Sequence, residues 1–507
     1  MTRYIADAGK MKEIEKYTID NIGIPSLVLM ERAALCVTQC IQKRFSKKDR
    51  VCVVCGPGNN GADGAAIARQ LSEDNYRVDV VITQNAEKFS AEMKKQTDIL
   101  NNLRVPVFDK IPDKDYACFV DAIFGIGLTR DISDERILEA IDTINSSDAY
   151  IYSVDIPTGI HTDTGLVMGR AVKASETITF TCEKIGLCLY PGKEYAGLVN
   201  GKNIGIFHDT IKTIGTNHIG FEKNVGASVL KRDASGNKGT FGKVAVIAGN
   251  GEITGAALLC AKAALKSGAG MVKVLSHDKT LDVIRRNLPE AMVQSIDNEE
   301  QLAKNIKMAV DWADSVVIGP GIGSDKTAYL KMQNVLTDFP DSKKLVIDAD
   351  GINLVAKHPK LKEMTNRVNS VIYTPHMLEL SRLTGMEISV LKENLDKVMM
   401  GIIKDNEAVF VCKDSVTRVY KKDRPVFINR FGNSGMATAG SGDVLAGVIG
   451  AIVARDGADL YESSALGVHL HSLAGDLAAN DCGENSLMAG DIIDALPVIF
   501  KNMEEFN

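Results

Sequence analysis

A glycine-rich loop near the amino terminus combines turn residues with side chains that could bind a ligand. Residues 56–64 have the sequence GPGNNGADG, between a β-branched run at 50–55 and a small-residue helical stretch at 65–71. The backbone N–H groups of such a loop and the helix N-terminus can hold a phosphate. A dinucleotide-dependent dehydrogenase also needs an acidic residue about 20 residues further on, whereas residues 81–85 have the sequence VITQN. We therefore predict a phosphate-bearing ligand without that ribose contact; a ligand-free turn is the alternative.

Acidic residues close two later apolar runs. Asp121 ends ACFVDAIFG and Asp155 ends IYSVDIPTG, and a glycine-containing loop follows each. Ligands of parallel α/β sheets bind at the carboxyl ends of strands, so we expect both acids to converge with Asn60 and Thr158. This oxygen-rich set suits a hard cation and a polar substrate better than zinc. Helix capping is the alternative role for a strand-end Asp.

A second glycine-rich segment lies near the carboxyl terminus. Residues 429–447 have the sequence NRFGNSGMATAGSGDVLAG and continue into an apolar helical pattern. Free N–H groups and the positive end of the helix would stabilise charge on a transferring phosphoryl group. Asp443, in the first helical turn, could take a proton from an attacking hydroxyl. The chain has no GxxxxGK[ST] motif, which argues against a P-loop enzyme; a glycine-rich cap followed by an ordinary acid is the alternative.

The elements that carry these residues alternate between strands and helices. Strand-like runs separated by helix-length segments predict parallel sheets with helices on both faces. Three closely spaced late runs predict an antiparallel meander at one sheet edge. The expected strands are 50–55, 77–83, 117–124, 150–156 and 176–182 in a first series, then 243–248, 271–276, 315–319, 345–350, 370–374, 408–413, 416–420 and 425–429.

A polar segment divides the two series. Periodicity fades between about residues 207 and 238, so we predict one α/β domain at residues 1–215 and a second at 225–507. The opening stretch, residues 10–34, is helical in pattern and broken at Gly23-Ile24-Pro25.

Composition limits the class of protein. The 507 residues are 45% hydrophobic and 24% charged, with a formal charge of −6 and no long run of either sign, which argues against a nucleic-acid partner. The strongly apolar stretch at 444–454 is shorter than the ~18 residues that span a bilayer, and no apolar signal core precedes it. We expect a cytoplasmic protein with no membrane association. The CxxC pair, Cys52 and Cys55, lies inside a β-run and predicts buried thiols rather than a metal or redox site.

Four motifs of the first domain resemble the NAD(P)H-hydrate epimerase family. They are GIPSLVLMERAA (23–34), CGPGNNGADG (55–64), VDAIFGIGL (120–128) and SVDIPTG (153–159). That family interconverts the two epimers of NADH or NADPH damaged by addition of water to the nicotinamide ring. The resemblance implies a Rossmann-like fold, with the hydrated dinucleotide contacted by Asn59, Asn60, Gly61, Ala62, Asp63, Gly125, Ile126, Gly127, Leu128, Thr129, Arg130, Asp131 and Asp155.

The same resemblance implies a potassium ion held by Asn60, Asp121 and Thr158. Ala62 stands where the family usually has glycine, and Thr158 stands where serine is common, which keeps the hydroxyl. The hydrated carbon is a hemiaminal centre, so a carboxylate could move a proton and tolerate transient positive charge. Whether Asp121 acts chemically or only holds the cation stays open.

The second domain resembles the ADP/ATP-dependent NAD(P)H-hydrate dehydratases of the ribokinase-like superfamily. The motifs are KGTFGKVAVIAGN (238–250), GAALLCAKAALKSGAGMVKV (255–274), VIGPGIG (317–323), DADGINLV (348–355), TPHMLELSRLTG (374–385) and GSGD (440–443). The resemblance implies that Asp443 is the catalytic base and that Ala256, Gly323 and His376 contact the hydrated dinucleotide. The adenine nucleotide would be held by Lys413, Asp414, Ser415, Val416, Thr417 and Gly442.

Two departures from the dehydratase pattern are visible. Met377 replaces the usual proline, and Asp414 replaces a common glycine in the nucleotide turn. Glu379, three residues after His376, could support Mg²⁺ on the phosphates through water. For His376 itself a core or capping role is the alternative.

Together the resemblances imply one bifunctional repair enzyme. Its first half would equilibrate the R and S hydrates, and its second would phosphorylate the S hydrate from ADP and eliminate the product to NAD(P)H. We expect ADP, Mg²⁺ and K⁺ as cofactors, the hydrates NADHX and NADPHX as substrates, and a homo-oligomer. Two rivals stay open: an ATP-dependent vitamin or sugar kinase with an accessory nucleotide-binding domain, and a regulatory protein that senses a nucleotide.

Overall fold

The computed structural model describes residues 2–225 and 232–504, which form two compact units. The first unit spans Arg3–Ile219 and the second continues from Gly220. The change from one unit to the other falls inside the polar segment at 207–238; residues 226–231 of that segment lie outside the described part, as do residues 1 and 505–507 of the two predicted domains.

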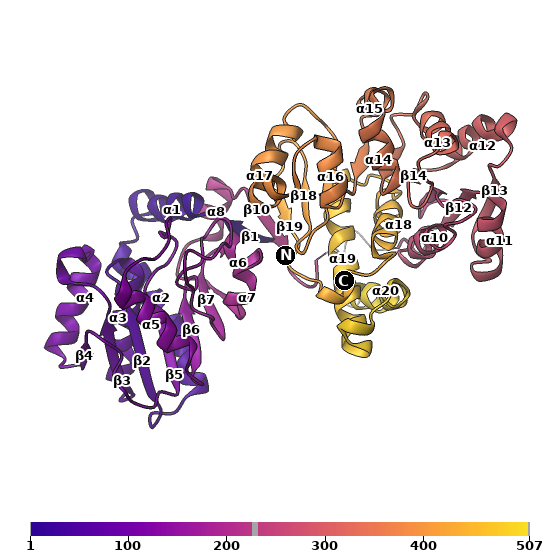
Figure 1. The fold of residues 1–507 in the computed structure, drawn as a ribbon. Coiled ribbons are helices and arrows are strands. Elements are labelled where there is room, and N and C mark those ends of the chain that lie inside the picture. Colours follow the sequence, from indigo (N-terminus) through magenta and orange to yellow (C-terminus); the bar gives the residue numbers. More distant parts are fainter. Residues whose placement is uncertain (1, 226–231, 505–507) are drawn as a thin grey trace. The chain divides into compact units, whose positions relative to one another are not determined.

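Seven strands form the sheet of the first unit, and every neighbouring pair in it is parallel (Figure 1). Their order across the sheet is β4 (Val107–Phe108), β3 (Arg77–Ile82), β2 (Arg50–Cys55), β5 (Cys118–Ala122), β6 (Tyr150–Val154), β7 (Glu176–Phe180) and β9 (Leu198–Lys202).

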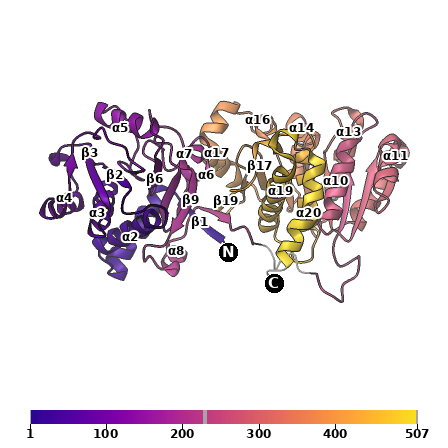
Figure 2. The ribbon, with the colours of Figure 1, turned by 90° about the horizontal axis from the view of Figure 1, so that it is seen from below.

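Helices cover both faces of this sheet. In Figure 2 the strands lie between α5 on one side and α2 and α3 on the other. The buried residues divide accordingly into two apolar clusters, one with α2, α3 and α4 and one with α5. The main helices are α2 (Ser26–Arg44), α3 (Asn59–Glu73), α4 (Ala91–Asn102) and α5 (Glu135–Asn145); shorter elements are η2 (Ala86–Lys88), β8 (Glu183–Lys184), α6 (Ile185–Cys188), α7 (Gly192–Ala196) and α8 (His208–Ile214).

The central strands are apolar along their whole length because helices cover them on both faces. All but the first residue of β2 are buried, and successive side chains alternate between the two apolar clusters. Cys55 belongs to the cluster with α2–α4, whereas Cys52 belongs to the cluster with α5. Burial raises the pKa of both thiols. The two sulfurs therefore face opposite sides of the sheet, and the prediction of buried strand thiols is confirmed.

The amino-terminal segment is helical and broken where the sequence predicted. Strand β1 (Thr2–Ala6) is followed by α1 (Ala8–Tyr17), by a π-helical turn, η1 (Thr18–Ile22), and then by α2. Asp7 caps α1 by accepting a hydrogen bond from the N–H of Lys10 at 2.6 Å. Gly23 ends the turn with a φ of 85°, a conformation that favours glycine.

The sheet of the second unit is parallel in its central part. From β13 to β17 every neighbouring pair is parallel, and β17, β18 and β19 then pair antiparallel. The order is β13 (Met292–Ser295), β12 (Met271–Ser276), β11 (Lys243–Ile247), β14 (Ser315–Ile318), β15 (Lys344–Ile347), β16 (Val371–Tyr373), β17 (Val409–Cys412), β18 (Arg418–Tyr420) and β19 (Val426–Ile428).

The antiparallel meander is confirmed, but its predicted position as the last part of the sheet is wrong. Strand β10 (His218–Phe221) lies next to β19. Phe221 packs against Phe427 with ring centroids 4.7 Å apart. Strand β10 has only four residues and lies in the polar region where the hydrophobic periodicity fades, so the sequence pattern did not predict a strand there.

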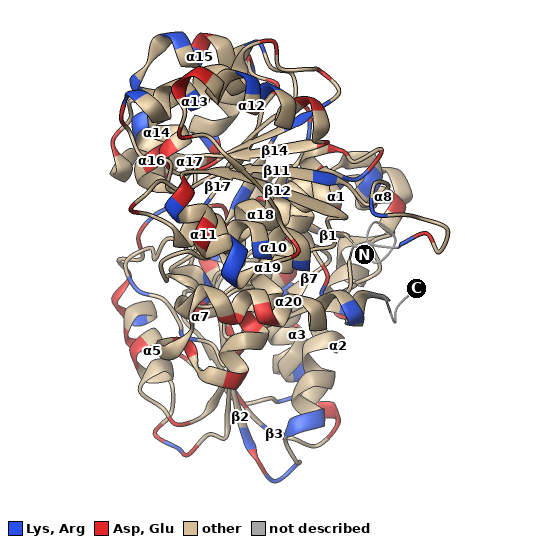
Figure 3. Cartoon of the chain, turned by 90° about the vertical axis from the view of Figure 1, so that its right-hand side faces the viewer, with Lys and Arg blue, Asp and Glu red and all other residues tan. Residues whose placement is uncertain are grey.

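Helices also cover both faces of this second sheet. Figure 3 shows α10, α18, α19 and α20 on one side of the strands and α12–α15 on the other, with acidic and basic residues side by side on single helices such as α11. The helices are α10 (Gly255–Lys266), α11 (Asp278–Asn287), α12 (Glu299–Trp312), α13 (Lys326–Leu336), α14 (Asp350–Lys357), α15 (Pro359–Asn366), α16 (Met377–Thr384), α17 (Ile388–Ile403), η3 (Ser434–Met436), α18 (Ser441–Val453), α19 (Leu460–Cys482), η4 (Glu484–Ser486) and α20 (Ala489–Glu504).

The helices of both units are amphipathic or internal to their unit. Within residues 2–225 and 232–504, none combines the length and the apolarity needed to cross a bilayer.

Helix α18 lies very close to α10, and a glycine makes this possible. A Cβ at Gly447 would lie 2.2 Å from the carbonyl oxygen of Cys260 and 3.0 Å from Ala263. We predict that Gly447→Ala destabilises the second unit by about 1–3 kcal/mol because the helices must separate. The control is Gly401→Ala in α17, where a Cβ meets nothing within 4 Å, and which should stabilise by about 0.5–1 kcal/mol.

Urea denaturation followed by tryptophan fluorescence measures the stability of the second unit in both variants. The signal comes from that unit because the single tryptophan of the chain is Trp312, the last residue of α12. Equal midpoints for the two variants would contradict the packing argument.

Candidate functional sites

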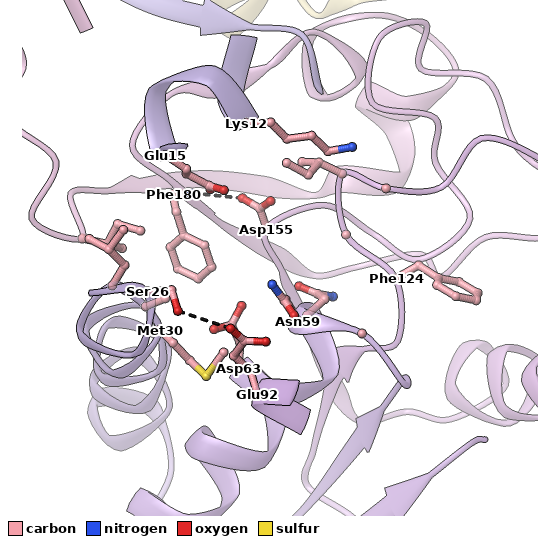
Figure 4. A pocket seen from close by; sticks show the side chains of 18 of the residues that line it. Lys12, Glu15, Ser26, Met30, Asn59, Asp63, Glu92, Phe124, Asp155 and Phe180 are labelled. Carbon is pink, nitrogen blue, oxygen red and sulfur yellow. Dashed lines mark hydrogen bonds between the residues drawn. The ribbon is translucent and has the colours of Figure 1, made fainter. Parts of the chain in front are cut away.

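The first unit has a cavity of about 480 Å³ at the carboxyl ends of β2, β5 and β6 (Figure 4). Side chains from α1, η1 and α2 line it together with the loops that follow these strands. A second cavity, of about 840 Å³, shares Pro57, Phe124, Gly127 and Leu128 with the first. Of the residues that the sequence indicated, the first cavity is lined by Asn59, Asn60, Asp63, Gly125, Ile126, Gly127, Leu128 and Asp155, and the second by Gly127, Leu128, Thr129, Arg130 and Asp131.

Gly61 and Ala62 lie behind the cavity wall rather than on it. Both are buried in the first turns of α3. A Cβ at Gly61 would lie 1.9 Å from the carbonyl oxygen of Gly56, so only glycine fits this turn. A Cβ at Gly64 would lie 2.5 Å from that of Ala122, which lets α3 approach the sheet. These residues shape the glycine loop, whereas Asn59, Asn60 and Asp63 present their side chains to the cavity.

Asp121 is a buried carboxylate held entirely by hydrogen bonds. Its Oδ1 accepts from the hydroxyl of Thr158 at 2.6 Å, and its Oδ2 accepts from the hydroxyl of Ser153 at 2.8 Å and from the N–H of Thr158 at 2.9 Å. Burial raises the pKa of Asp121, although these hydrogen bonds oppose the rise. Within the described chain, no lysine, arginine or histidine forms an ion pair with it.

The predicted neighbours of Asp121 do gather beside it. The hydroxyl of Thr158 also accepts from the N–H of Phe124 at 3.0 Å, and a Cβ at the next residue, Gly125, would lie 3.2 Å from the amide of Asn60. The amide nitrogen of Asn60 is buried and has no hydrogen-bond partner among the described residues. Since the two ends of an amide are assigned from their neighbours, either its oxygen or its nitrogen can face this space.

Asp155 occupies a strained position at the end of β6. Its φ of 68° is in the left-handed region, where a residue with a side chain needs strong local support. Oδ1 of Asp155 receives the Nζ of buried Lys184 in an ion pair, the hydroxyl of Thr179 at 3.3 Å and the N–H of Phe180 at 3.2 Å. Lys184 in turn donates to the carbonyl oxygen of Phe180 at 3.0 Å. This network anchors Asp155 against the sheet.

Sequence reasoning did not identify Lys184 or Glu15, although both belong to this site. Glu15 lines the cavity from α1, and burial and the charge of Asp155 raise its pKa to about 7. Burial, Asp155 and Glu15 also raise the pKa of Asp63 well above its usual range. The helical periodicity of residues 8–17 could have indicated Glu15, because Glu15 lies next to the buried face that Met11 and Ile14 form on α1.

The site of the second unit centres on the N-terminus of α18. Gly440 precedes the helix with a φ of 90°, and a Cβ there would lie 3.9 Å from Oδ2 of Asp443 and 2.5 Å from Leu259. Ser441 is buried, with its hydroxyl 3.5 Å from Nε2 of His471. Burial lowers the pKa of His471 to about 4, so this ring is neutral at physiological pH. The helix start therefore presents backbone N–H groups beside Asp443.

A partly buried lysine lies among the carboxylates around Asp443. Lys413 Nζ donates to Oδ1 of Asp348 at 2.7 Å, and a Cβ at Gly442 would lie 3.2 Å from Nζ. Burial and the negative charge of Asp348 raise the pKa of Asp443 to about 7, while Lys413 lowers it. Asp443 is therefore poised to exchange a proton near neutrality. Lys413 also adjoins His376 through a parallel backbone bridge.

His376 caps α16, as the structural alternative for it anticipated. Its Nδ1 accepts from the N–H groups of Leu378 and Glu379 at 3.1 and 3.2 Å. Glu379 completes a capping box by accepting from the N–H of His376 at 2.8 Å. Nε2 of His376 lies 3.3 Å from Oε1 of Glu379, and half of the His376 side chain is exposed to a ligand. Burial, together with Lys413, lowers the pKa of His376.

The remaining predicted residues lie around this centre or in the neighbouring turn. The N–H of Gly323 donates to Oδ2 of Asp350 at 2.9 Å, and Asp350 is one of the charges that raise the pKa of Asp443. Ala256 lies in α10, with its Cβ 3.2 Å from a Cβ built on Gly321. In the turn between β17 and β18, Asp414 and Ser415 are exposed, Val416 is buried and Thr417 is partly buried.

Comparison with known proteins matches each unit to a family. Residues 26–186 match the family described as YjeF-related protein N-terminus, and residues 244–498 match NAD(P)H-hydrate dehydratase. Similarity to a ribokinase-like superfamily protein from Enterococcus faecalis, with a TM-score of 0.50 and 28% identity, covers 57% of this chain and 97% of that one. The predicted fold class, a parallel-sheet α/β unit followed by a ribokinase-like unit, is confirmed.

Relatives of the whole chain carry both parts in the same order. The bifunctional NAD(P)H-hydrate repair enzyme Nnr of Moorella thermoacetica is 31% identical, over 99% of this chain and 97% of its own length. The protein of the same name from Escherichia coli is 29% identical, over 96% of this chain and 92% of its own. Because the similarity at 31% identity runs through both units with almost no uncovered residues, the chain belongs to the family of bifunctional NAD(P)H-hydrate repair enzymes.

Proposed function

We propose that this chain repairs hydrated NADH and NADPH, with one reaction in each unit. The first unit interconverts the R and S hydrates, and the second converts the S hydrate to NAD(P)H with ADP as phosphoryl donor. The observation that carries the proposal is the match of both units, in one chain, to the two parts of the repair enzymes. In each unit an acid whose pKa burial raises lies among the residues assigned to the reaction: Asp63 and Asp121 in the first unit and Asp443 in the second.

In the second unit, Asp443 takes the proton of the ring hydroxyl as that oxygen attacks the β-phosphorus of ADP. The new O–P bond forms as the bond to the leaving AMP breaks. N–H groups at the start of α18 stabilise the negative charge on the phosphoryl oxygens. The phosphate ester is a good leaving group, so the ring nitrogen expels it and loss of a ring proton restores the dihydronicotinamide.

The nucleotide is assigned to Lys413, Asp414, Ser415, Val416, Thr417 and Gly442. Nζ of Lys413 lies next to the backbone at Gly442, where the helix N-terminus receives the phosphates. Gly323, His376 and Ala256 then hold the hydrated dinucleotide. Mg²⁺, when bound, neutralises phosphate charge; the fully packed carboxylate of Glu379 fits a role through water rather than direct ligation.

In the first unit, the set Asn60, Asp121 and Thr158 fits a potassium ion. Asp121 is a buried carboxylate that lacks an ion-pair partner in the described chain, and Asn60 has a buried amide atom without a hydrogen-bond partner. A monovalent cation with oxygen ligands would balance this charge. The hydrated dinucleotide is assigned to the two adjoining cavities, with Asn59 to Asp63 and Asp155 at the first and Thr129 to Asp131 at the second.

Replacing the base tests the second reaction. We predict that Asp443→Asn lowers the rate of ADP-dependent NADH formation from the S hydrate by about 10²- to 10⁴-fold, because the hydroxyl proton has no acceptor. The recovered near-ultraviolet absorbance of NADH measures this rate, with ADP and with ATP in parallel. The matched control is Asp456→Asn, an exposed acid after the other end of α18, which should behave as wild type. An active Asp443→Asn, or a stable phosphorylated product, would instead favour a kinase.

The dependence of this reaction on pH follows from the state of Asp443. The base must be ionised, so kcat/KM should fall below a pH of about 7, the value to which burial and Asp348 raise the pKa. In Asp348→Asn the midpoint should move to lower pH, because a nearby negative charge is lost and Lys413 is released from its ion pair. A midpoint that moved upward, or did not move, would contradict this electrostatic assignment.

Removing the hydroxyl of Thr158 tests the cation site. We predict that Thr158→Val lowers the apparent affinity for K⁺, measured from the rate of epimerisation, by about 10- to 100-fold. ADP-dependent dehydration of the S hydrate should continue. With a mixture of epimers, NADH recovery should then stall at the S share. Thr143→Val on the exposed face of α5 is the control. Epimerisation that shows no response to K⁺ in wild type would remove potassium from the proposal.

A further inference from the structure

Glu15 reaches the cavity of the first unit from a helix outside the strand-end loops. Asp7 caps α1, and the N–H of Ala8 donates to Asp163 Oδ1 at 2.7 Å, so the helix is tied to the segment that follows Asp155. Met11 and Ile14 are buried beneath the same helix. In Figure 4 the carboxyl group of Glu15 points toward that of Asp155. The fold therefore holds two carboxyl groups facing each other at one cavity wall.

The hydrogen bonds of Asp155 are distributed unequally between its oxygens. Lys184, Thr179 and the N–H of Phe180 all donate to Oδ1 within the described part of the chain. None of these three donors bonds to Oδ2, and Figure 4 shows the carboxyl group of Asp155 beside that of Glu15. A carboxylate with one anchored and one available oxygen can accept a hydrogen bond from a neighbouring carboxylic acid.

The carboxyl groups around Glu15 and Asp155 outnumber the nearby cations. Four carboxyl groups line the cavity, from Glu15, Asp63, Glu92 and Asp155. Glu92 accepts a hydrogen bond from the hydroxyl of Ser26 at 3.3 Å, and Lys184 is a buried cation paired with Asp155. Lys12 on α1 also lines the cavity but is exposed. Glu31 of α2, which adds negative charge near Asp63, is paired with Arg69 at 2.6 Å. With acids in excess, one of these groups stays protonated near neutral pH.

We propose that Glu15 is a catalytic acid–base residue of the first unit, which gives its proton to the departing hydroxyl of the hydrate and regains one from the returning water. Asp155, anchored by Lys184, stabilises the positive charge that develops on the ring. This assignment rests on the proposed epimerase function, and it names a residue from an element that the motifs of the glycine loop and strand ends do not include.

The step balances with water alone as the exchanged species. The C–O bond of the hemiaminal breaks with its electron pair on oxygen, the proton of Glu15 completes a water molecule, and the nitrogen lone pair forms a C=N⁺ bond. Water then attacks the other face of that carbon, the C=N⁺ electrons return to nitrogen, and the excess proton passes to the carboxylate of Glu15. No oxidant, reductant or nucleotide is consumed.

The titration of Glu15 has a definite sign. Burial and Asp155 favour its neutral form, while Lys184 and Lys12 oppose them, and the resulting pKa is about 7. The acid form is therefore present below that pH and is lost above it. The rate of epimerisation should fall on the alkaline side of a pH of about 7, opposite in direction to the acid limb expected for dehydration in the second unit.

The experiment uses the full-length chain and the pure S hydrate without ADP, and follows formation of the R hydrate by chromatography after subtraction of the uncatalysed rate. Glu15→Gln should lower kcat by about 10²- to 10⁴-fold with little change in KM, and should remove the alkaline limb. Glu15→Asp should restore part of the rate together with that limb. Glu13→Gln, an exposed neighbour on α1, should match wild type.

Addition of ADP to Glu15→Gln checks the second unit, which should form NADH from the S hydrate at the wild-type rate. A wild-type rate and pH profile in Glu15→Gln would overturn the assignment. A purely structural role of Glu15 predicts that Glu15→Gln and Glu15→Asp raise KM by the same factor and keep the alkaline limb of the pH profile. That result would also overturn the assignment. A wild-type chain that epimerises no faster than buffer would refute the proposed function itself, and the role of Glu15 with it.

Discussion

Burial of carboxylates at the carboxyl ends of parallel strands is the constraint from which both sites follow. An ionised acid removed from water is costly unless a cation or hydrogen bonds replace its solvent. Each unit supplies a lysine as the partner, the buried Lys184 for Asp155 and the partly buried Lys413 for Asp348. Loss of one partner from such a buried pair typically costs about 3–5 kcal/mol. Each lysine therefore neutralises the charge of one strand-end carboxylate and stabilises the fold there, while a second carboxyl group nearby has no ion-pair partner of its own among the described residues.

That uncompensated acid is what gives each unit its chemistry. In the second unit it is Asp443, and in the first it is Glu15; burial and a like charge raise the pKa of each to about 7. The two acids belong to unrelated elements, the first turn of α18 and the middle of α1. The similarity is thus one of physics rather than of sequence: a fixed ion pair, a second carboxyl group beside it and a wall of packed residues.

Close packing around glycine brings these groups within reach. Where Gly61 and Gly64 leave no room for a Cβ, α3 lies against the sheet and Asn60 meets the residues that follow β5. Gly447 similarly lets α18 approach α10 and places its N-terminus beside the ends of the strands. Helix ends and strand ends then share one edge, which is the arrangement that α/β sheets use to bind phosphates and polar ligands.

Local patterns in the chain were enough to predict the central strands of both sheets, the break before α2, the antiparallel pairing of β17 to β19, and two groups of polar residues at strand ends. They did not predict the strands β1, β4, β8, β9, β10 and β13. The predicted features are encoded by period and by turn residues over a few positions, and the motifs that resemble known families lie in the same short segments. Folding in three dimensions was needed to show that Glu15 and Lys184 meet Asp155, that His376 caps a helix, and that β10 extends the second sheet. Such contacts join residues far apart in the chain, and the pKa values near 7 arise from burial and from the charges that those contacts bring together.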